Sequence, residues 1–120
     1  MPAIPAFLLK KLYVKQSLKN TPAGVELEIK NTLAPGTIVG AAPVAIDGVA
    51  HPLADTIVIS SGKEYVFAEV SKENPLTFGI NTSIIIRLKG VQLEPGTHKI
   101  SIPVLTKEAG ELQIEVSDTI

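Results

Sequence analysis

Hydrophobic and polar residues alternate with a period of two over much of the chain. The clearest case is Val25, Leu27 and Ile29, which alternate with Glu26 and Glu28. Successive side chains of a strand point to opposite faces of its sheet, so this pattern predicts a strand with one buried face. No segment keeps a helical period for three turns. The pattern therefore predicts an all-β chain.

Turn-forming residues separate the alternating segments. They occur at residues 20–24, Pro35-Gly36, Asp47-Gly48, Ser61-Gly62, residues 94–96 and Ala109-Gly110. An Asp-Gly pair between apolar runs is a strong signal for a two-residue hairpin. These signals divide the chain into about eight or nine short strands, a number typical of sandwiches. We expect residues 1–120 to form one antiparallel β-sandwich, either jelly-roll or immunoglobulin-like.

The apolar composition favours pleated sheets, because 14 Ile and 11 Val stand against 12 Leu and β-branched side chains suit strands. The phase of the alternation and the position of each apolar run predict the core. The expected core residues are Leu27, Ile29, Ile46, Ile57, Ile59, Val66, Ile85, Leu88, Ile100, Ile102, Leu112 and Ile114.

Residues 1–10 form an apolar arm ahead of the first clear strand. The arm contains Ile4, Phe7, Leu8 and Leu9, and two prolines disfavour a regular hydrogen-bonded start. Burial of each such side chain contributes about 1.5–3 kcal/mol, so something must cover them. The same domain could do so. Our hypothesis is that another chain does, which would make the protein at least a dimer with these four residues in the interface.

Composition excludes several classes of function. The net charge is −1 without a basic block, and the chain has no Trp and only five aromatic residues, which argues against nucleic-acid binding. Cysteine is absent, which excludes disulfides and thiolate ligands and suits a reducing compartment. No apolar stretch approaches the ~20 residues that span a bilayer, and the start does not resemble a signal peptide. We expect a cytoplasmic protein that does not bind membranes.

Candidate chemistry is sparse. The two histidines, His51 and His98, could bind a metal together with one carboxylate from Asp47, Asp55 or Glu94. However, the histidines lie on different expected strands, and no spacing pairs them with a carboxylate. We therefore predict no catalytic residue, no metal and no cofactor. His51, His98 and Asp47 remain the candidate site residues.

Four short segments occur in an order that suggests a family. They are residues 17–20 (Ser-Leu-Lys-Asn), 25–29, 44–48 (Val-Ala-Ile-Asp-Gly) and 94–100 (Glu-Pro-Gly-Thr-His-Lys-Ile). In this order the chain resembles the small β subunit of the C-glycoside deglycosidases. The resemblance implies a β-sandwich subunit without catalytic residues, which assembles with a larger metal-dependent partner.

Three functions remain open at this stage. The first is a non-catalytic subunit that acts in assembly, either by homo-oligomerisation or as the accessory subunit of a larger enzyme, which would explain the apolar arm. The second is a module that binds carbohydrate or another small ligand, although sugar sites usually use Trp or Tyr faces. The third is a metal-dependent enzyme that uses His51 and His98. A sandwich hosts many functions, so the fold alone does not decide among them.

Overall fold

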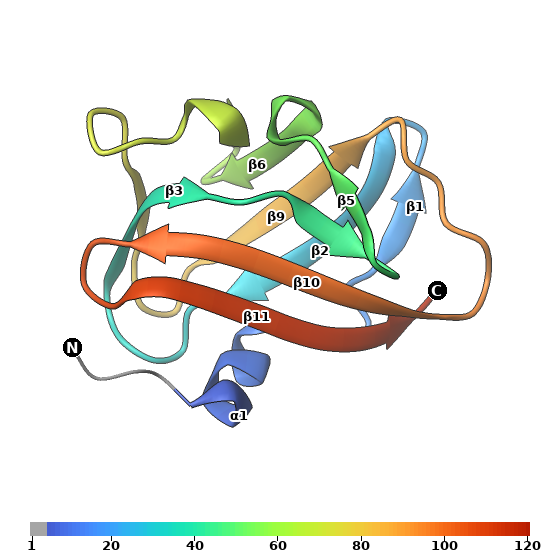
Figure 1. Ribbon diagram of the computed structural model, residues 1–120, viewed down its shortest axis with the longest axis horizontal. Helices are drawn as coiled ribbons and strands as arrows, with labels where there is room; N and C mark the ends of the chain where they lie inside the picture. The colour runs from blue at the N-terminus through green and yellow to red at the C-terminus, as the bar shows by residue number, and fades with distance from the viewer. Residues whose placement is uncertain (1–4) are drawn as a thin grey trace.

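Two antiparallel sheets pack face to face in the computed structural model, which describes residues 5–120 (Figure 1). Sheet A has five strands in the order β1-β2-β9-β6-β7, and sheet B has six, in the order β5-β4-β10-β3-β8 with β11 paired to β10. Because β11 follows the whole length of β10, β3 and β4 share the other edge of that strand. The expected all-β antiparallel sandwich is confirmed.

The strands of sheet A are β1 (Lys19–Thr21), β2 (Gly24–Lys30), β6 (Thr56–Ser60), β7 (Lys63–Val66) and β9 (Ser83–Lys89). Those of sheet B are β3 (Gly36–Ala41), β4 (Val44–Ile46), β5 (Val49–His51), β8 (Leu76–Phe78), β10 (Thr97–Thr106) and β11 (Gly110–Thr119). The helical turns are α1 (Ala6–Leu9), η1 (Lys10–Leu12), η2 (Leu53–Asp55) and η3 (Phe67–Glu69). The described part of the chain thus has more strands than expected, since β1 and β8 are too short to show alternation.

The hairpin turns form where the sequence predicts them. Asp47 and Gly48 join β4 to β5 with φ angles of 53° and 82°. Ser61 and Gly62 join β6 to β7 with φ angles of 53° and 78°. Positive φ at both central residues is what a two-residue type I′ hairpin requires, because it matches the twist of the strands. These two predictions are confirmed.

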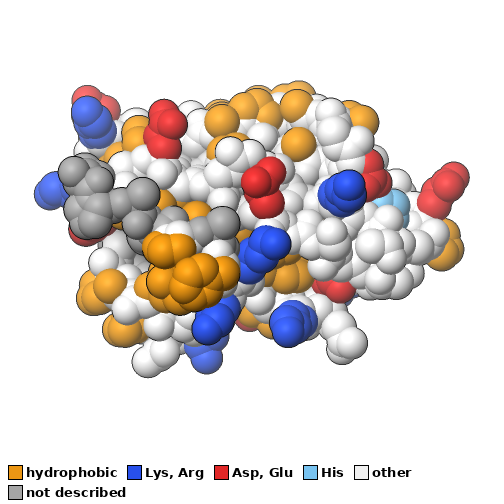
Figure 2. Space-filling view, turned by 60° about the horizontal axis from the view of Figure 1, so that its bottom comes forward, with side chains coloured by type: hydrophobic (Ala, Val, Ile, Leu, Met, Phe, Trp, Pro, Cys, Tyr) orange, Lys and Arg blue, Asp and Glu red, His pale blue; other side chains and the backbone are white. Residues whose placement is uncertain are grey.

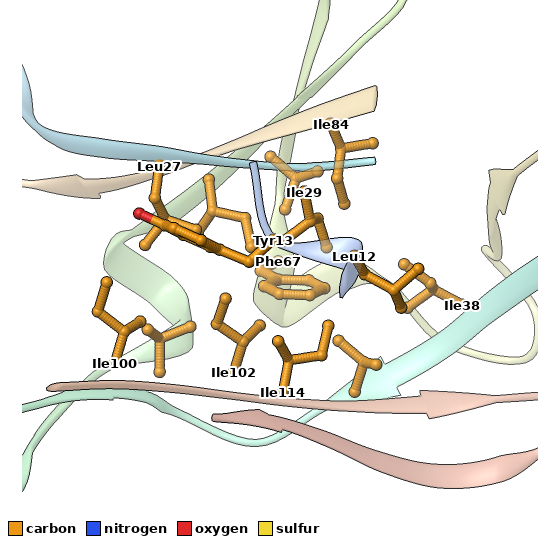
Figure 3. Close-up of a cluster of buried hydrophobic side chains, with 14 of the residues drawn as sticks. Leu12, Tyr13, Leu27, Ile29, Ile38, Phe67, Ile84, Ile100, Ile102 and Ile114 are labelled. Carbon is orange, nitrogen blue, oxygen red and sulfur yellow. The ribbon is translucent and has the colours of Figure 1, made fainter. Parts of the chain in front are cut away.

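One hydrophobic core fills the space between the sheets (Figure 3). The expected core residues that it contains are Leu27, Ile29, Ile46, Leu88, Ile100, Ile102 and Ile114, with Leu112 packed against its margin. Phe67 ends the apolar run Tyr65-Val66-Phe67, which indicates a strand, but it instead begins η3 and lies between the sheets with 1% of its surface exposed. Clear alternation therefore located the core correctly in β2, β10 and β11.

Four expected core residues lie instead on the outer face of sheet A: Ile57, Ile59, Val66 and Ile85. In β6 and β9 the inward side chains are those of Val58, Ile84 and Ile86. Both strands contain uninterrupted apolar runs, in which hydrophobicity alone does not say which residues face inward. The prediction is wrong for Ile59, Val66 and Ile85, because the phase was assigned one residue out of step. Ile57 is buried as expected, with 9% of its surface exposed, but on the outer face of the sheet.

The segment over residues 12–18, in which Leu12, Val14 and Leu18 alternate with polar residues, does not form the strand that this alternation indicates. Leu12 and Tyr13 are adjacent and both 5% exposed, which a strand with one buried face does not permit. The chain forms η1 there, and a single bridge between Tyr13 and Ile29 is its only ladder contact with β2 among the described residues. This geometry lets consecutive large side chains enter the core at the open margin of the sandwich.

Gly24 tolerates no side chain. Its φ is +146°, and a Cβ built on it would lie 2.1 Å from the carbonyl oxygen of Leu88. We expect Gly24→Ala to lower the free energy of unfolding by at least ~2 kcal/mol, because backbone strain adds to a steric clash in the β2–β9 ladder. The measurement is urea denaturation followed by circular dichroism.

Gly90→Ala is the matched control, since Gly90 also has a positive φ (+74°) but open space around its Cβ position. It should cost only about 1 kcal/mol, the strain of the left-handed conformation itself. Equal losses in the two variants would contradict the proposed clash.

Candidate functional site

The outer face of sheet A bears four apolar side chains, partly exposed except for the buried Ile57, which we call the isoleucine face: Ile57, Ile59, Val66 and Ile85. Ile57 lies opposite Val66, and Ile59 lies opposite Ile85, so the four side chains are cross-strand neighbours on β6, β7 and β9. None of them belongs to the core cluster between the sheets. An antiparallel sheet that covers a core on one side usually presents polar side chains on the other. The isoleucine face departs from that rule.

An ion-paired cluster borders this face and also crosses it, because Arg87 on β9 approaches Glu64 on β7, on the far side of β6. Arg87, which lies opposite Ile57, donates from Nε and Nη2 to Oε2 of Glu26, each at 2.7 Å, and its Nη1 lies 3.4 Å from Oε2 of Glu64. Glu26 is only 7% exposed despite its outward position. The hydrogen bond to Glu26 is the main cause of the raised pKa of Arg87. The charges at the border are thus paired already and need no further partner.

The alternation over residues 25–29 predicts that Glu26 and Glu28 lie on a solvated outer face, and it does not identify this pair. The missing information was the register, because Glu26 and Arg87 are 61 residues apart and meet only once β2 pairs with β9. A signal for the outward position of Ile85 was present in the sequence. Ser83, Arg87 and Lys89 share its phase in β9, and polar residues in one phase indicate the outer face.

The apolar N-terminal segment is partly covered by its own domain. Leu9 is 6% exposed within the core cluster and Leu8 is half-buried, whereas Phe7 remains 64% exposed. Ile4 lies outside the described residues. Figure 2 brings this side of the molecule forward and shows hydrophobic side chains gathered beside several basic ones. Of the expected interface residues described here, Phe7 is thus the one left open to contact.

A partly buried hydrogen bond fixes the segment that follows α1. The Tyr13 hydroxyl donates to Oδ2 of Asp118 at 2.6 Å, and the backbone N–H of Leu18 donates to the same oxygen at 3.2 Å. Burial and the hydrogen bond to Asp118 raise the pKa of Tyr13. Burial acts to raise the pKa of Asp118 as well, but hydrogen bonds from Tyr13 and nearby backbone groups outweigh it and lower that pKa. The contact ties the N-terminal segment to β11, along which α1 lies (Figure 1).

His98 and Asp47 meet, as the metal-site hypothesis requires, but in a different role. Nδ1 of His98 lies 2.6 Å from Oδ2 of Asp47, and Nε2 lies 2.7 Å from the backbone oxygen of Glu94. Both partners are acceptors, so the ring satisfies both only when each nitrogen carries a proton. The backbone N–H of Lys99 donates to Oδ1 of Asp47 at 2.9 Å. The pair therefore clamps the β4–β5 turn to the start of β10.

His51 does not join this pair. It lies opposite Val44 at the far end of the β4–β5 hairpin, whereas Asp47 stands at the turn. Asp47 is three positions after Val44 along the chain, roughly 10 Å at about 3.3 Å per residue. Within residues 5–120, no group of three or more His, Asp or Glu side chains is arranged to hold a metal ion. The structure thus brings together two of the three candidate residues.

The family follows from a comparison with known proteins. Residues 8–120 match the family model of the hydroxymethylglutaryl-CoA reductase N-terminal domain. The chain belongs to this family. A search of the curated proteins finds no match. In the described part of the domain, no helix has the length and apolar character needed to cross a membrane.

This match overturns the resemblance to the C-glycoside deglycosidase β subunit. The segments that suggested it include the Asp47-Gly48 hairpin and the turn at Gly96, whose φ is +134°. Such residues are selected by local turn geometry in many unrelated sheets. Shared turn residues therefore show where the chain reverses direction and say little about the family to which it belongs.

The His98–Asp47 clamp predicts a pH-dependent stability. The hydrogen bond between His98 and Asp47 is the main cause of both pKa shifts in the clamp. It raises the pKa of His98 above 6.5 and lowers the pKa of Asp47 below 3.8. When the pKa of a histidine is higher in the folded state than in the unfolded state, protonation stabilises the fold. This stabilisation is fully present below the unfolded-state pKa of ~6.5 and is lost as the pH rises through the folded-state pKa. The Tm difference between the wild-type domain and His98→Gln should therefore shrink from about pH 6 to about pH 8.

The measurement is thermal denaturation across this pH range, with NMR titration of the His98 ring to locate its pKa directly. His51→Gln is the matched control. It removes the other histidine and leaves the clamp intact, so the pH dependence that comes from His98 should persist in it. A His98 pKa at or below 6.5 would refute the clamp.

Proposed function

We propose that this domain is a non-catalytic assembly domain of a hydroxymethylglutaryl-CoA reductase, and that it docks on the catalytic part of the enzyme through the isoleucine face. The family match supports the connection to the reductase. The observation that carries the proposal is the apolar outer surface of sheet A, built by Ile57, Ile59, Val66 and Ile85 on three adjacent strands. A partly exposed apolar surface with polar surroundings is typical of a protein–protein contact.

The chemistry of this face fits docking. Full burial of an Ile or Val side chain contributes about 1.5–3 kcal/mol, so completing the burial of the half-covered Ile59, Val66 and Ile85 gives about 1 kcal/mol each. Ile57 is already buried and gains little. The side chains are β-branched and held on strands, so little rotamer freedom is lost on contact. The Glu26–Arg87 pair at the border is satisfied within the domain, so a partner would not have to bury an unpaired charge there.

The described residues do not fit a dinucleotide cofactor. Such a site needs a glycine-rich turn that leads from a strand into a helix, whose N-terminus holds the phosphates. The longest helix described in this chain is α1, with four residues, and no strand leads into it. The reductase chemistry would therefore come from another part of the enzyme, and this domain would contribute to its assembly.

The test is the double substitution Ile59→Lys/Ile85→Lys, with Leu105→Lys as the matched control. Leu105 is also half-buried, and it lies opposite Glu111 on the outer face of sheet B. Each protein is purified from its own host, and its native mass and associated hydroxymethylglutaryl-CoA reductase activity are measured. We expect the wild type and Leu105→Lys to co-elute with the activity above the chain mass of 12.7 kDa. The double variant should elute alone with an unchanged circular dichroism spectrum.

The other outcomes identify what is wrong. A wild-type protein that elutes as a monomer without reductase activity would contradict assembly altogether. A homo-oligomer without reductase activity would contradict docking on the enzyme and favour self-association. If the double variant keeps the activity, the isoleucine face is not the docking surface, and the exposed Phe7 on α1 becomes the next surface to test.

A further inference from the structure

A small cavity opens between the two sheets at one end of the sandwich. It lies where the loop of residues 31–35 approaches the β10–β11 turn, and its volume is about 110 Å³. Its walls come from both sheets and from η1, and they include Leu12, Ile29, Ile38, Val104 and Ile114. All five of these side chains are buried in the core cluster. The interior surface of the cavity is thus almost wholly apolar.

The polar groups around the cavity are already bonded within the protein. The Asn31 side-chain amide donates to the backbone oxygens of Ala34 at 2.6 Å and Phe78 at 2.8 Å. The Glu108 carboxylate accepts hydrogen bonds from the backbone N–H of Thr37 at 2.8 Å and from its hydroxyl at 3.0 Å. Within residues 5–120, no buried side-chain nitrogen or oxygen lacks a partner. A ligand whose polar groups had to enter the cavity would therefore find nothing there to replace their bonds to water, whereas a hydroxyl that stays at the open mouth keeps those bonds.

Charge at the mouth further restricts the ligand. The hydrogen bond from the Thr37 backbone is the main cause that lowers the pKa of Glu108, and the carboxylate stays ionised near neutral pH. An anionic group that enters beside it would be repelled. The mouth therefore favours a molecule without negative charge.

We propose that this cavity binds a small, uncharged, apolar molecule about the size of one aromatic ring. Apolar cavities of about 150 Å³ lined by Leu, Ile and Phe stay dry and take up benzene. The cavity in this domain is somewhat smaller but opens at its mouth. The site lies on the inner side of sheet A and is independent of the isoleucine face, so it goes beyond the proposed docking function.

The experiment is a titration of the full chain, labelled at its methyl groups, with benzene, benzyl alcohol and benzoate, followed by NMR. Benzene and benzyl alcohol should shift the methyl signals of Leu12, Ile38 and Ile114 saturably, and should raise the Tm because a ligand that binds only the folded state stabilises it. The methyl signals of Ile59 and Ile85, on the outer face, should not move. Benzoate should bind at least tenfold more weakly than benzyl alcohol.

Two variants fill the cavity from its margin, Leu112→Phe and Ala109→Leu, since both residues line it and are only half-buried. Each should abolish the benzene shifts while the circular dichroism spectrum stays native. Ala42→Leu, an exposed alanine that does not line this cavity, is the matched control and should bind like the wild type. The proposal is overturned if benzene causes no saturable shift, if shifts extend to Ile59 and Ile85, if benzoate binds equally well, or if both folded filling variants still bind.

Discussion

The register between β2 and β9 determines the rest of this domain. In that register Leu27 lies opposite Ile86 inside the sandwich, and Glu26 lies opposite Arg87 outside it. A slip of one residue would turn every β9 side chain to the other face and would place Arg87 in the core. Burial of an unpaired guanidinium costs far more than one apolar contact returns. The Glu26–Arg87 pair thus favours the single register in which the isoleucines of β9 divide between the two faces.

This division explains why sheet A is apolar on both sides. Once β9 is fixed by β2, the pairing of β6 with β9 places Val58 inward and Ile57 and Ile59 outward. Strands that are apolar on both faces are typical of sheets covered on both sides. In this domain the inner side is covered by sheet B. The outer side therefore has the apolar composition of a sheet face that another layer covers. No such layer is present among the described residues of the domain.

The sequence predicted what depends on neighbours in the chain. Turn residues such as Asp47 and Gly48 act through their own backbone conformation, and the hairpin they form is confirmed. Strict alternation likewise located the buried face of β2. The faces of residues 57–59 could not be deduced, because Thr56 and Ser60, the polar residues that flank the run, point inward with Val58 and so give no outward signal. The prediction failed where the phase depends on a strand elsewhere in the chain.

The candidate sites depend on contacts between residues that are far apart in the chain. His98 and Asp47 are 51 residues apart, and Tyr13 and Asp118 are 105 apart, so neither pair shows any spacing that a motif could capture. The sequence named His98 and Asp47 as candidates for metal chemistry, but it could not show that both ring nitrogens would face acceptors. The same reasoning applies to the family, because short turn motifs that are repeated in many sheets suggested the wrong one.

The separation of the two faces of sheet A also separates folding from docking. The core contacts that hold the domain together are made by the inward residues, such as Ile84 and Ile86, which are at most 1% exposed. The outward residues Ile59 and Ile85 are not part of that core. A polar substitution on the outer face therefore removes apolar surface without opening a cavity. It should not cause the large loss of folding stability that follows truncation of a core side chain. For the same reason, a stable domain retains an apolar outer face only at the risk of non-specific association, which a partner on that face would remove.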